Sequence, residues 1–146
     1  MRLAVTILVL LLSAACVQAS ESARSTDVRG DVATDTPLIR LIARPADFDG
    51  QRVRVIGFVR LEFEGNVMYP HKEDYDHALL GNGVWLSISD QIQQRTAELT
   101  GKYCLVEGRF SASNRGHMGV WSGAIEDVSR FQVWSGSRRT KKSRRQ

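Results

Sequence analysis

The stretch that decides the fold runs from Arg52 to Glu64 and reads R-V-R-V-I-G-F-V-R-L-E-F-E. Apolar side chains, mostly valines, recur at every second position from Val53 to Phe63 except at Gly57, and arginines and glutamates fill most of the positions between them. Such strict alternation predicts a β-strand with one buried and one wetter face. The stretch is about twice the usual strand length. Gly57 lies in its middle, where a missing side chain permits a bend, so one strand can serve both halves of a small closed barrel.

The segments on either side of this strand predict the other elements of one small domain. Before it, Thr36 caps and Pro37 opens a short helix over 38–43, which Pro45 ends. After it, the pattern predicts a turn, a strand, a polar segment with one or two helical turns, a strand, a helix and two further strands, over 64–66, 67–70, 71–80, 84–88, 91–99, 103–110 and 118–125. We expect residues 131–134 to extend the edge of the last strand.

Five strands in this order, with a helix between the third and the fourth, indicate an all-β fold with short helices. This is the order of the OB-fold, a five-stranded Greek-key barrel. A lipocalin-like barrel needs more strands, and a ferredoxin-like fold needs two crossover helices. We therefore expect an OB-like barrel over residues 37–135.

The first 19 residues have the features of an export signal. Arg2 supplies the positive start, and the nearly all-apolar run 3–12 is too short to span a bilayer as a mature helix. Two cleavage sites stay open: V-Q-A before Ser20 fits ordinary signal peptidase, and L-S-A-A-C resembles a bacterial lipobox that would leave a lipidated Cys16 as the N-terminus. Both place the domain outside the cytoplasm, in the periplasm or anchored to the bacterial envelope. Residues 20–36, rich in Ser, Asp, Thr and Ala, are expected to form a flexible linker.

The net charge of +4 is concentrated at the C-terminus. Six of the 20 Lys and Arg residues lie within 138–146 and Arg2 lies in the leader, so 13 basic residues remain against 16 acidic ones. This balance argues against nucleic acid as a partner of the folded part. The basic tail 136–146 is expected to be a disordered, solubilising segment. Its alternative role is to anchor the protein on anionic lipid headgroups or to bind an acidic partner.

Four segments carry a resemblance to a known group of proteins: DGQRVRVIGFVRLEFEGNVMYPHKEDYDHAL, GVWLSI, GKYCLVEGRF and GHMGVWSGAI. With these segments, which fall between Leu38 and Trp134, the chain resembles a family of small exported bacterial proteins that have an OB-like β-barrel domain and no assigned activity. The resemblance implies an exported small β-domain. It carries over no catalytic residue.

The histidines of the chain are His71, His77 and His117. In the OB order, the loop that holds His71 and His77 and the loop that holds His117 open at the same end of the barrel. Together with a nearby carboxylate such as Asp74, these side chains could hold zinc or another divalent metal as a cofactor. The alternative is that they are polar loop and capping residues, since no HExxH-like register is present.

Carboxylates and aromatic side chains give two further candidates. Glu62 and Glu64 would point to the same side of their strand, like the paired acid and base of glycoside hydrolases. Such neighbours are more often a solvated face, here paired with Arg60. Six aromatic residues could form a stacking face for a ligand, although we expect most of them in the core: Phe58, Tyr69, Tyr75, Trp85, Trp121 and Trp134. Cys104 has no CxxC partner and is expected to be a buried free thiol.

These observations favour an exported binding module of the envelope over an enzyme. The partner would be a small ligand or an envelope protein at the barrel end formed by loops 71–83 and 111–118. The residues expected to bind it are His71, Lys72, Asp74, Tyr75, His117 and Tyr69. One alternative is a metal-dependent activity of His71, His77 and His117 at that same end. Another is an envelope scaffold that docks a partner through a sheet edge and its tail, with a lipid at Cys16 or the tail as membrane anchor.

Overall fold

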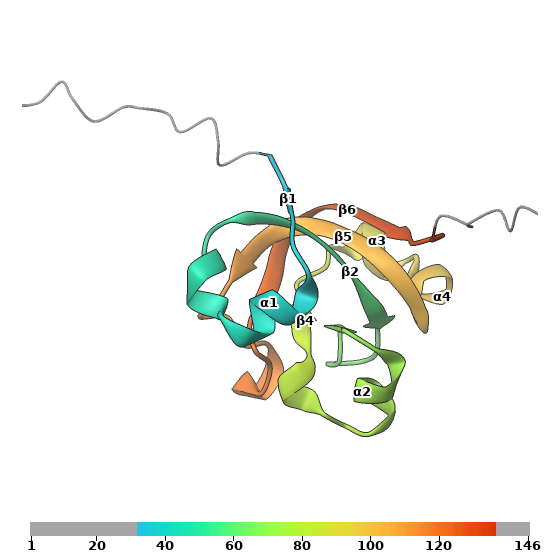
Figure 1. Cartoon of the computed structure of the whole chain (residues 1–146). Coiled ribbons are helices and arrows are strands. Elements are labelled where there is room, and N and C mark those ends of the chain that lie inside the picture. Colours follow the sequence, from blue (N-terminus) through green and yellow to red (C-terminus); the bar gives the residue numbers. More distant parts are fainter. Residues whose placement is uncertain (1–31, 137–146) are drawn as a thin grey trace, which may run out of the picture.

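A computed structural model describes residues 32–136 of the chain (Figure 1). The predicted export signal with Cys16, most of the linker and the basic tail from residue 137 lie outside the described residues. The strands are β1 Thr34–Asp35, β2 Arg52–Arg60, β3 Val67–Tyr69, β4 Val84–Leu86, β5 Lys102–Ser111 and β6 Ala124–Val133. The helices are α1 Leu38–Ala43, α2 Lys72–Asp76, α3 Asp90–Gln93 and α4 Thr96–Leu99, with 3-10 turns η2 Pro45–Phe48, η3 Leu80–Asn82 and η4 His117–Gly119.

The strands close into a barrel. Their order is β1-β2-β3-β4-β6-β5, and a further antiparallel pairing of β2 with β5 joins the two ends of the sheet. Helices α3 and α4 lie between β4 and β5, which are the third and fourth strands of the barrel, while the two-residue β1 adds to β2 outside it. The predicted fold is therefore confirmed: an all-β, OB-like, closed five-stranded barrel with short helices.

Strand β2 is the common element of both halves of the barrel, as its alternation predicts. Val53, Val55 and Val59 face the core with at most 1% of their surface exposed. One edge of β2 pairs with β5 along nearly its whole length, and the other edge pairs first with β1 and then with β3. A Cβ atom on Gly57 would lie 2.6 Å from the backbone oxygen of Tyr69, so glycine lets β3 approach β2 closely.

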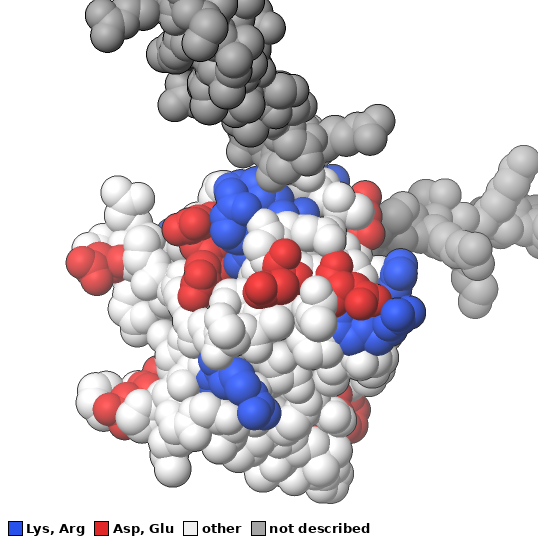
Figure 2. Space-filling view, turned by 90° about the vertical axis from the view of Figure 1, so that its left-hand side faces the viewer, with Lys and Arg blue, Asp and Glu red and all other residues white. Residues whose placement is uncertain are grey.

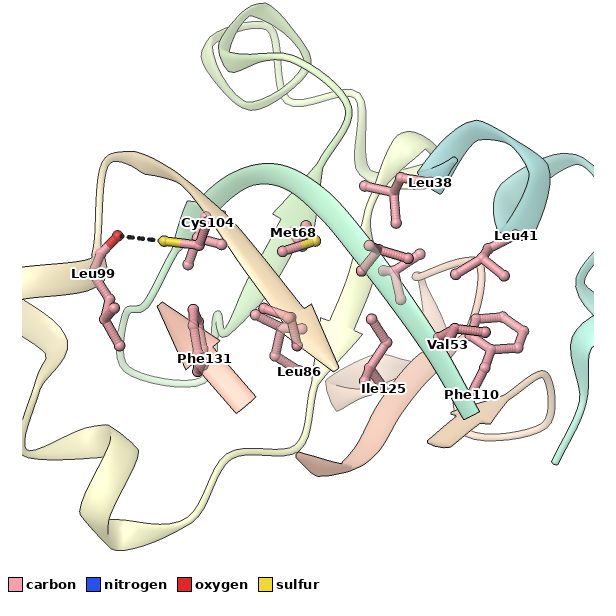
Figure 3. Close-up of a cluster of buried hydrophobic side chains, with 14 of the residues drawn as sticks. Leu38, Leu41, Val53, Met68, Leu86, Leu99, Cys104, Phe110, Ile125 and Phe131 are labelled. Carbon is pink, nitrogen blue, oxygen red and sulfur yellow. Dashed lines mark hydrogen bonds between the residues drawn. The ribbon is translucent and has the colours of Figure 1, made fainter. Parts of the chain in front are cut away.

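One hydrophobic cluster fills the barrel (Figure 3). Met68, Leu86, Phe110 and Ile125 are fully buried, and Leu38 and Leu41 of α1 close one end of the cluster. Cys104 belongs to this cluster as a buried free thiol, which confirms its prediction, and its sulfur lies 3.6 Å from the carbonyl oxygen of Leu99. Burial of this set is the main contribution to the stability of the barrel.

The last strand is the main error of the sequence-based assignment. It was expected over 118–125, but β6 begins at Ala124 and continues to Val133. The segment before it is a loop, in which Met118 and Gly119 have positive φ angles of 63° and 68°. Residues 131–133 thus lie within the strand and do not form a separate extension of it.

Other predicted boundaries and one predicted cap also differ from the structure. Strand β2 ends at Arg60, so residues 61–64 form a turn. The helix expected over 91–99 is broken into α3 and α4 at Arg95, whose Nη1 atom donates a hydrogen bond to the carbonyl oxygen of Phe131. Thr36 does not cap α1, because its hydroxyl donates to the carbonyl oxygen of Thr34 and Pro37 is the residue that precedes the helix.

The surface charges are mixed. On the face shown in Figure 2, Lys and Arg side chains lie next to Asp and Glu side chains instead of forming one continuous basic area. Within residues 32–136, no helix is long and apolar enough to cross a membrane.

Candidate functional site

Three loops meet over the outer face of β3 and β4. The backbone N–H of Ser122, in the loop 112–123 between β5 and β6, donates to the carbonyl oxygen of Gly83 at 3.1 Å. The same loop reaches the turn 61–66, where Nε2 of His117 lies 3.5 Å from Oε2 of Glu64. The loop 112–123 therefore contacts both the segment 71–83, at Gly83, and the turn 61–66, while the binding end expected from loops 71–83 and 111–118 remains a prediction.

Trp121 is the side chain on which these loops pack. It is 7% exposed and lies against Tyr69 of β3 and Trp85 of β4, with ring centroids 6.1 and 6.4 Å away. Added Cβ atoms on Gly83 or Gly116 would lie 3.0 Å or less from the Trp121 ring, so these glycines make room for it. In the OB-fold, the face of strands two and three commonly binds ligands by stacking. Here that face is covered by the chain's own tryptophan.

The aromatic side chains therefore serve mainly packing. Phe58, Tyr69 and Trp121 are buried, and Tyr75 and Trp85 are half-buried within or against the same outer cluster. Burial raises the pKa of Tyr69 to about 12, with a further contribution from neighbouring Tyr75. This phenol is therefore neutral across the physiological range. The exposed member of the set is Trp134, which lies on another face.

A small cavity of about 160 Å³ remains beneath the loops. Its polar wall is made by Arg60, whose guanidinium lies 4.6 Å from the centre of the Tyr75 ring and pairs with Glu62. The Tyr75 hydroxyl donates to Glu62 at 2.9 Å. The hydrogen bond from Arg60 lowers the pKa of Glu62, and the bond to Glu62 raises the pKa of Tyr75. Because typical small-molecule sites measure about 300–1,000 Å³, this cavity is too small for most ligands.

The idea of Glu62 and Glu64 as a catalytic pair does not fit this geometry. Both residues follow the end of β2, so they do not share one face of a strand. Glu62 pairs with Arg60, as the alternative of a solvated, charge-paired face predicted. Glu64 contacts His117 of another loop.

Most of the other residues predicted to bind a ligand form hydrogen bonds or ion pairs within their own loop. The backbone N–H of His71 donates to Asp74 at the start of α2, and the second oxygen of Asp74 accepts a hydrogen bond from Asn82. Lys72 forms an ion pair with Asp76 one helical turn later. Of the predicted residues, Tyr69 and Tyr75 line the small cavity, and His117 lies at the tip of the loop 112–123.

The predicted metal site of His71, His77 and His117 is not formed in the described residues. Within 32–136, no group of three or more His, Cys, Asp or Glu side chains is placed to hold a metal ion. His71 caps α2 and His77 follows its C-terminal end, whereas His117 reaches the turn 61–66. The loops come together, but the three rings do not converge with carboxylates.

At the end of the barrel where the three loops meet, several apolar side chains are exposed, a feature that the sequence analysis missed. The three loops present four of them: Phe63 is 94% exposed, Met118 is 83% exposed, and Leu79 and Leu80 of the segment 71–83 are 48% and 41% exposed. Together with Glu64 and His117 they make what we name the loop surface. Glu64 and Met118 have φ angles of 57° and 63°, a left-handed conformation that costs non-glycine residues about 1–2 kcal/mol. Backbone strain of this kind concentrates at functional surfaces.

No family model matches this chain, and no curated protein matches it.

Proposed function

We propose that the protein is an exported, non-enzymatic binding module of the bacterial envelope, which docks a partner protein on its loop surface. The observation that carries this proposal is the near-complete exposure of Phe63 and Met118 on neighbouring loops. Their sequence neighbours Glu64 and His117 lie 3.5 Å apart. Large apolar side chains gathered on one exposed surface mark interaction sites.

The loop surface suits a protein partner better than a small ligand. The cavity beneath it measures only about 160 Å³, and its walls are already hydrogen-bonded to one another. The exposed apolar side chains instead lie on neighbouring loops, and Glu64 and His117 add polar groups beside them. Aromatic and Met residues at the centre with polar groups around them are typical of protein interfaces.

Export supports the same proposal from the sequence. With either cleavage site, the leader is expected to direct the domain to the periplasm or the envelope, and the resemblance to small exported proteins implies the same. The partner would accordingly be an envelope protein with an apolar patch. The loops 71–83 and 111–118 supply the binding end, together with the turn 61–66.

The test is affinity capture from an envelope extract with the purified full chain. We expect a discrete partner to be retained by the unchanged chain and lost by the double variant Phe63→Ser, Met118→Ser. The matched control is Ile39→Ser, because Ile39 is 59% exposed on α1, outside the loop surface. Circular dichroism verifies that both variants are folded. Capture that persists in the double variant, or that is lost equally in the control, would refute the loop surface as the docking site.

A further inference from the structure

The outer face of β2, β5 and β6 carries three cross-strand rows of different chemistry. These strands lie side by side in the barrel (Figure 1). In the first row, Arg54, Glu107 and Arg130 are paired across the strands. The second row consists of Ile56, Leu105 and Gln132. The third row consists of Phe58 and Tyr103, and the carbonyl oxygen of Tyr103 accepts a hydrogen bond from the backbone N–H of Trp134. The face therefore changes from charged to apolar to aromatic along the strands.

A groove of about 680 Å³ lies on this face, within the size range of small-molecule sites. Ile56 and Leu105 line it as apolar residues, and Trp134 adds an aromatic wall that is 40% exposed. The opposite wall is formed by the segment 35–37, and the charged end by Arg54 and Arg130. The groove thus offers an apolar wall, an aromatic ring and two guanidinium groups in one concave surface.

The two arginines that line the groove keep donors that are not used within the described residues. Glu107, placed between them, accepts hydrogen bonds from Nε of Arg54 at 2.6 Å and from Nη1 of Arg130 at 3.1 Å. Nη1 of Arg54 donates to Asp35, and Nε of Arg130 donates to Gln132. Within residues 32–136, the Nη2 atom of each arginine has no hydrogen-bond partner. Glu107 therefore orients both guanidinium groups without using all of their donors.

The carboxylate of Asp35 accepts a hydrogen bond from Nη1 of Arg54, in the way that the carboxylate of a ligand would. Its side chain is 80% exposed and lies 3.1 Å from Nη1 of Arg54, at the edge of the groove. An exposed ion pair of this kind is weak and readily exchanged. A free carboxylate that enters the groove can replace Asp35 on Arg54 and also use the Nη2 donors.

We propose that this groove binds a small organic anion, which has a carboxylate on Arg54 and Arg130 and a planar apolar body against Ile56, Leu105 and Trp134. The pairing follows from the chemistry of the walls. Arginine recognises carboxylates through charge-assisted hydrogen bonds, and an aromatic ring stacks on planar groups. This site is separate from the loop surface and does not depend on the docking proposed there.

The test is a titration of the ¹⁵N-labelled full chain with 2-naphthoate, followed by NMR through the indole N–H signal of Trp134. The signal is assigned with the variant Trp134→Phe. We expect a saturable shift, with a dissociation constant about tenfold higher in Arg130→Gln, because a charge-assisted hydrogen bond is lost. Asp35→Asn should bind 2-naphthoate more tightly, because the competing carboxylate is gone.

Matched probes and variants separate this proposal from simple apolar binding. Arg44→Gln removes an exposed arginine that pairs with Asp47, outside the groove, and should bind 2-naphthoate like the unchanged chain. The neutral 2-naphthylmethanol should bind at least tenfold more weakly than the carboxylate. The proposal is overturned by the absence of a saturable Trp134 shift, by equal affinity in Arg130→Gln, or by equal binding of the alcohol. The variant Phe63→Ser should leave this binding unchanged, whatever its effect on docking at the loop surface.

Discussion

The Nε2 atom of His117 lies 3.5 Å from the Oε2 atom of Glu64, so the loop between β5 and β6 touches the turn between β2 and β3. Both side chains are about half exposed, and even fully charged pairs with such exposure contribute only about 0–1 kcal/mol to stability. The contact therefore positions the two loop tips more than it stabilises them. It brings together the two loops that carry the exposed residues Phe63 and Met118.

A substitution at Gly57 tests whether β2 and β3 approach each other closely. A Cβ atom there would lie 2.6 Å from both Cγ of Met68 and the backbone oxygen of Tyr69. Because the backbone of β3 is held in the barrel, Gly57→Ala should lower the free energy of unfolding by about 1–3 kcal/mol, as overpacking does. Urea unfolding followed by circular dichroism measures the change.

The control for this prediction is Gly81→Ala. Nothing lies within 4 Å of a Cβ atom built on Gly81, so the substitution should change stability by less than about 0.5 kcal/mol. If both alanine variants unfold at the same urea concentration as the unchanged chain, β2 and β3 do not approach one another as described.

Trp121 is expected to hold the three loops through its shape and not through a hydrogen bond. Its Nε1 atom is buried and has no hydrogen-bond partner among the described residues. Trp121→Ala should therefore cost about 3–5 kcal/mol and expose the loop 112–123 to protease. Trp121→Phe should cost clearly less, because it keeps a ring in the cluster and removes no hydrogen bond. Equal losses for the two variants in urea unfolding would point to a hydrogen-bonding role of the indole.

Acid should weaken the fold through Glu107. The hydrogen bond from Arg54 and then that from Arg130 lower the pKa of Glu107 below its ordinary value of 4.5. The unfolded chain therefore binds this proton more readily, so the stabilisation exists above pH 4.5 and is lost as the pH falls through the lower folded value. At pH 7, Glu107→Gln should be less stable than the unchanged chain by about 1–3 kcal/mol. This difference should shrink in urea unfolding toward pH 2, and a constant difference would exclude the ion pairs as its source.

Cys104 should be chemically silent in the folded protein. Burial raises the pKa of its thiol to about 11, so the reactive thiolate is scarce at pH 8. In a Cys16→Ser variant, the thiol reagent DTNB should react only after guanidinium unfolds the chain. Since the unfolded thiol ionises near pH 9, the free energy of unfolding should fall as the pH rises from 9 to 11. Rapid labelling under native conditions would show that Cys104 is not held in the core.

The barrel could be predicted from sequence because β2 alternates so regularly. Val53, Val55 and Val59 define the core face without reference to any other segment. The number and order of the other predicted strands and helices then excluded most topologies for the domain. The fold thus rested on local patterns, which a sequence shows directly.

The errors arose where distant residues decide the local structure. The segment 118–123 has apolar residues like a strand, but it forms a loop in which Trp121 packs on Tyr69 and Trp85, residues that are distant in the sequence. The expected helix is interrupted at Arg95, and the guanidinium of this residue bonds to Phe131, 36 residues further on. The histidines were grouped by the end of the barrel they share, and topology alone does not bring side chains to a common point.

The most direct test of the account uses the photo-crosslinker p-benzoylphenylalanine in place of Phe63, Met118 or Ile39 in cells that carry the full chain. All three positions are exposed, but only Phe63 and Met118 belong to the loop surface. We expect irradiation to join the protein to the same discrete envelope partner from positions 63 and 118 and not from position 39. The same products at all three positions, or none at 63 and 118, would contradict the loop surface as the place where this protein binds.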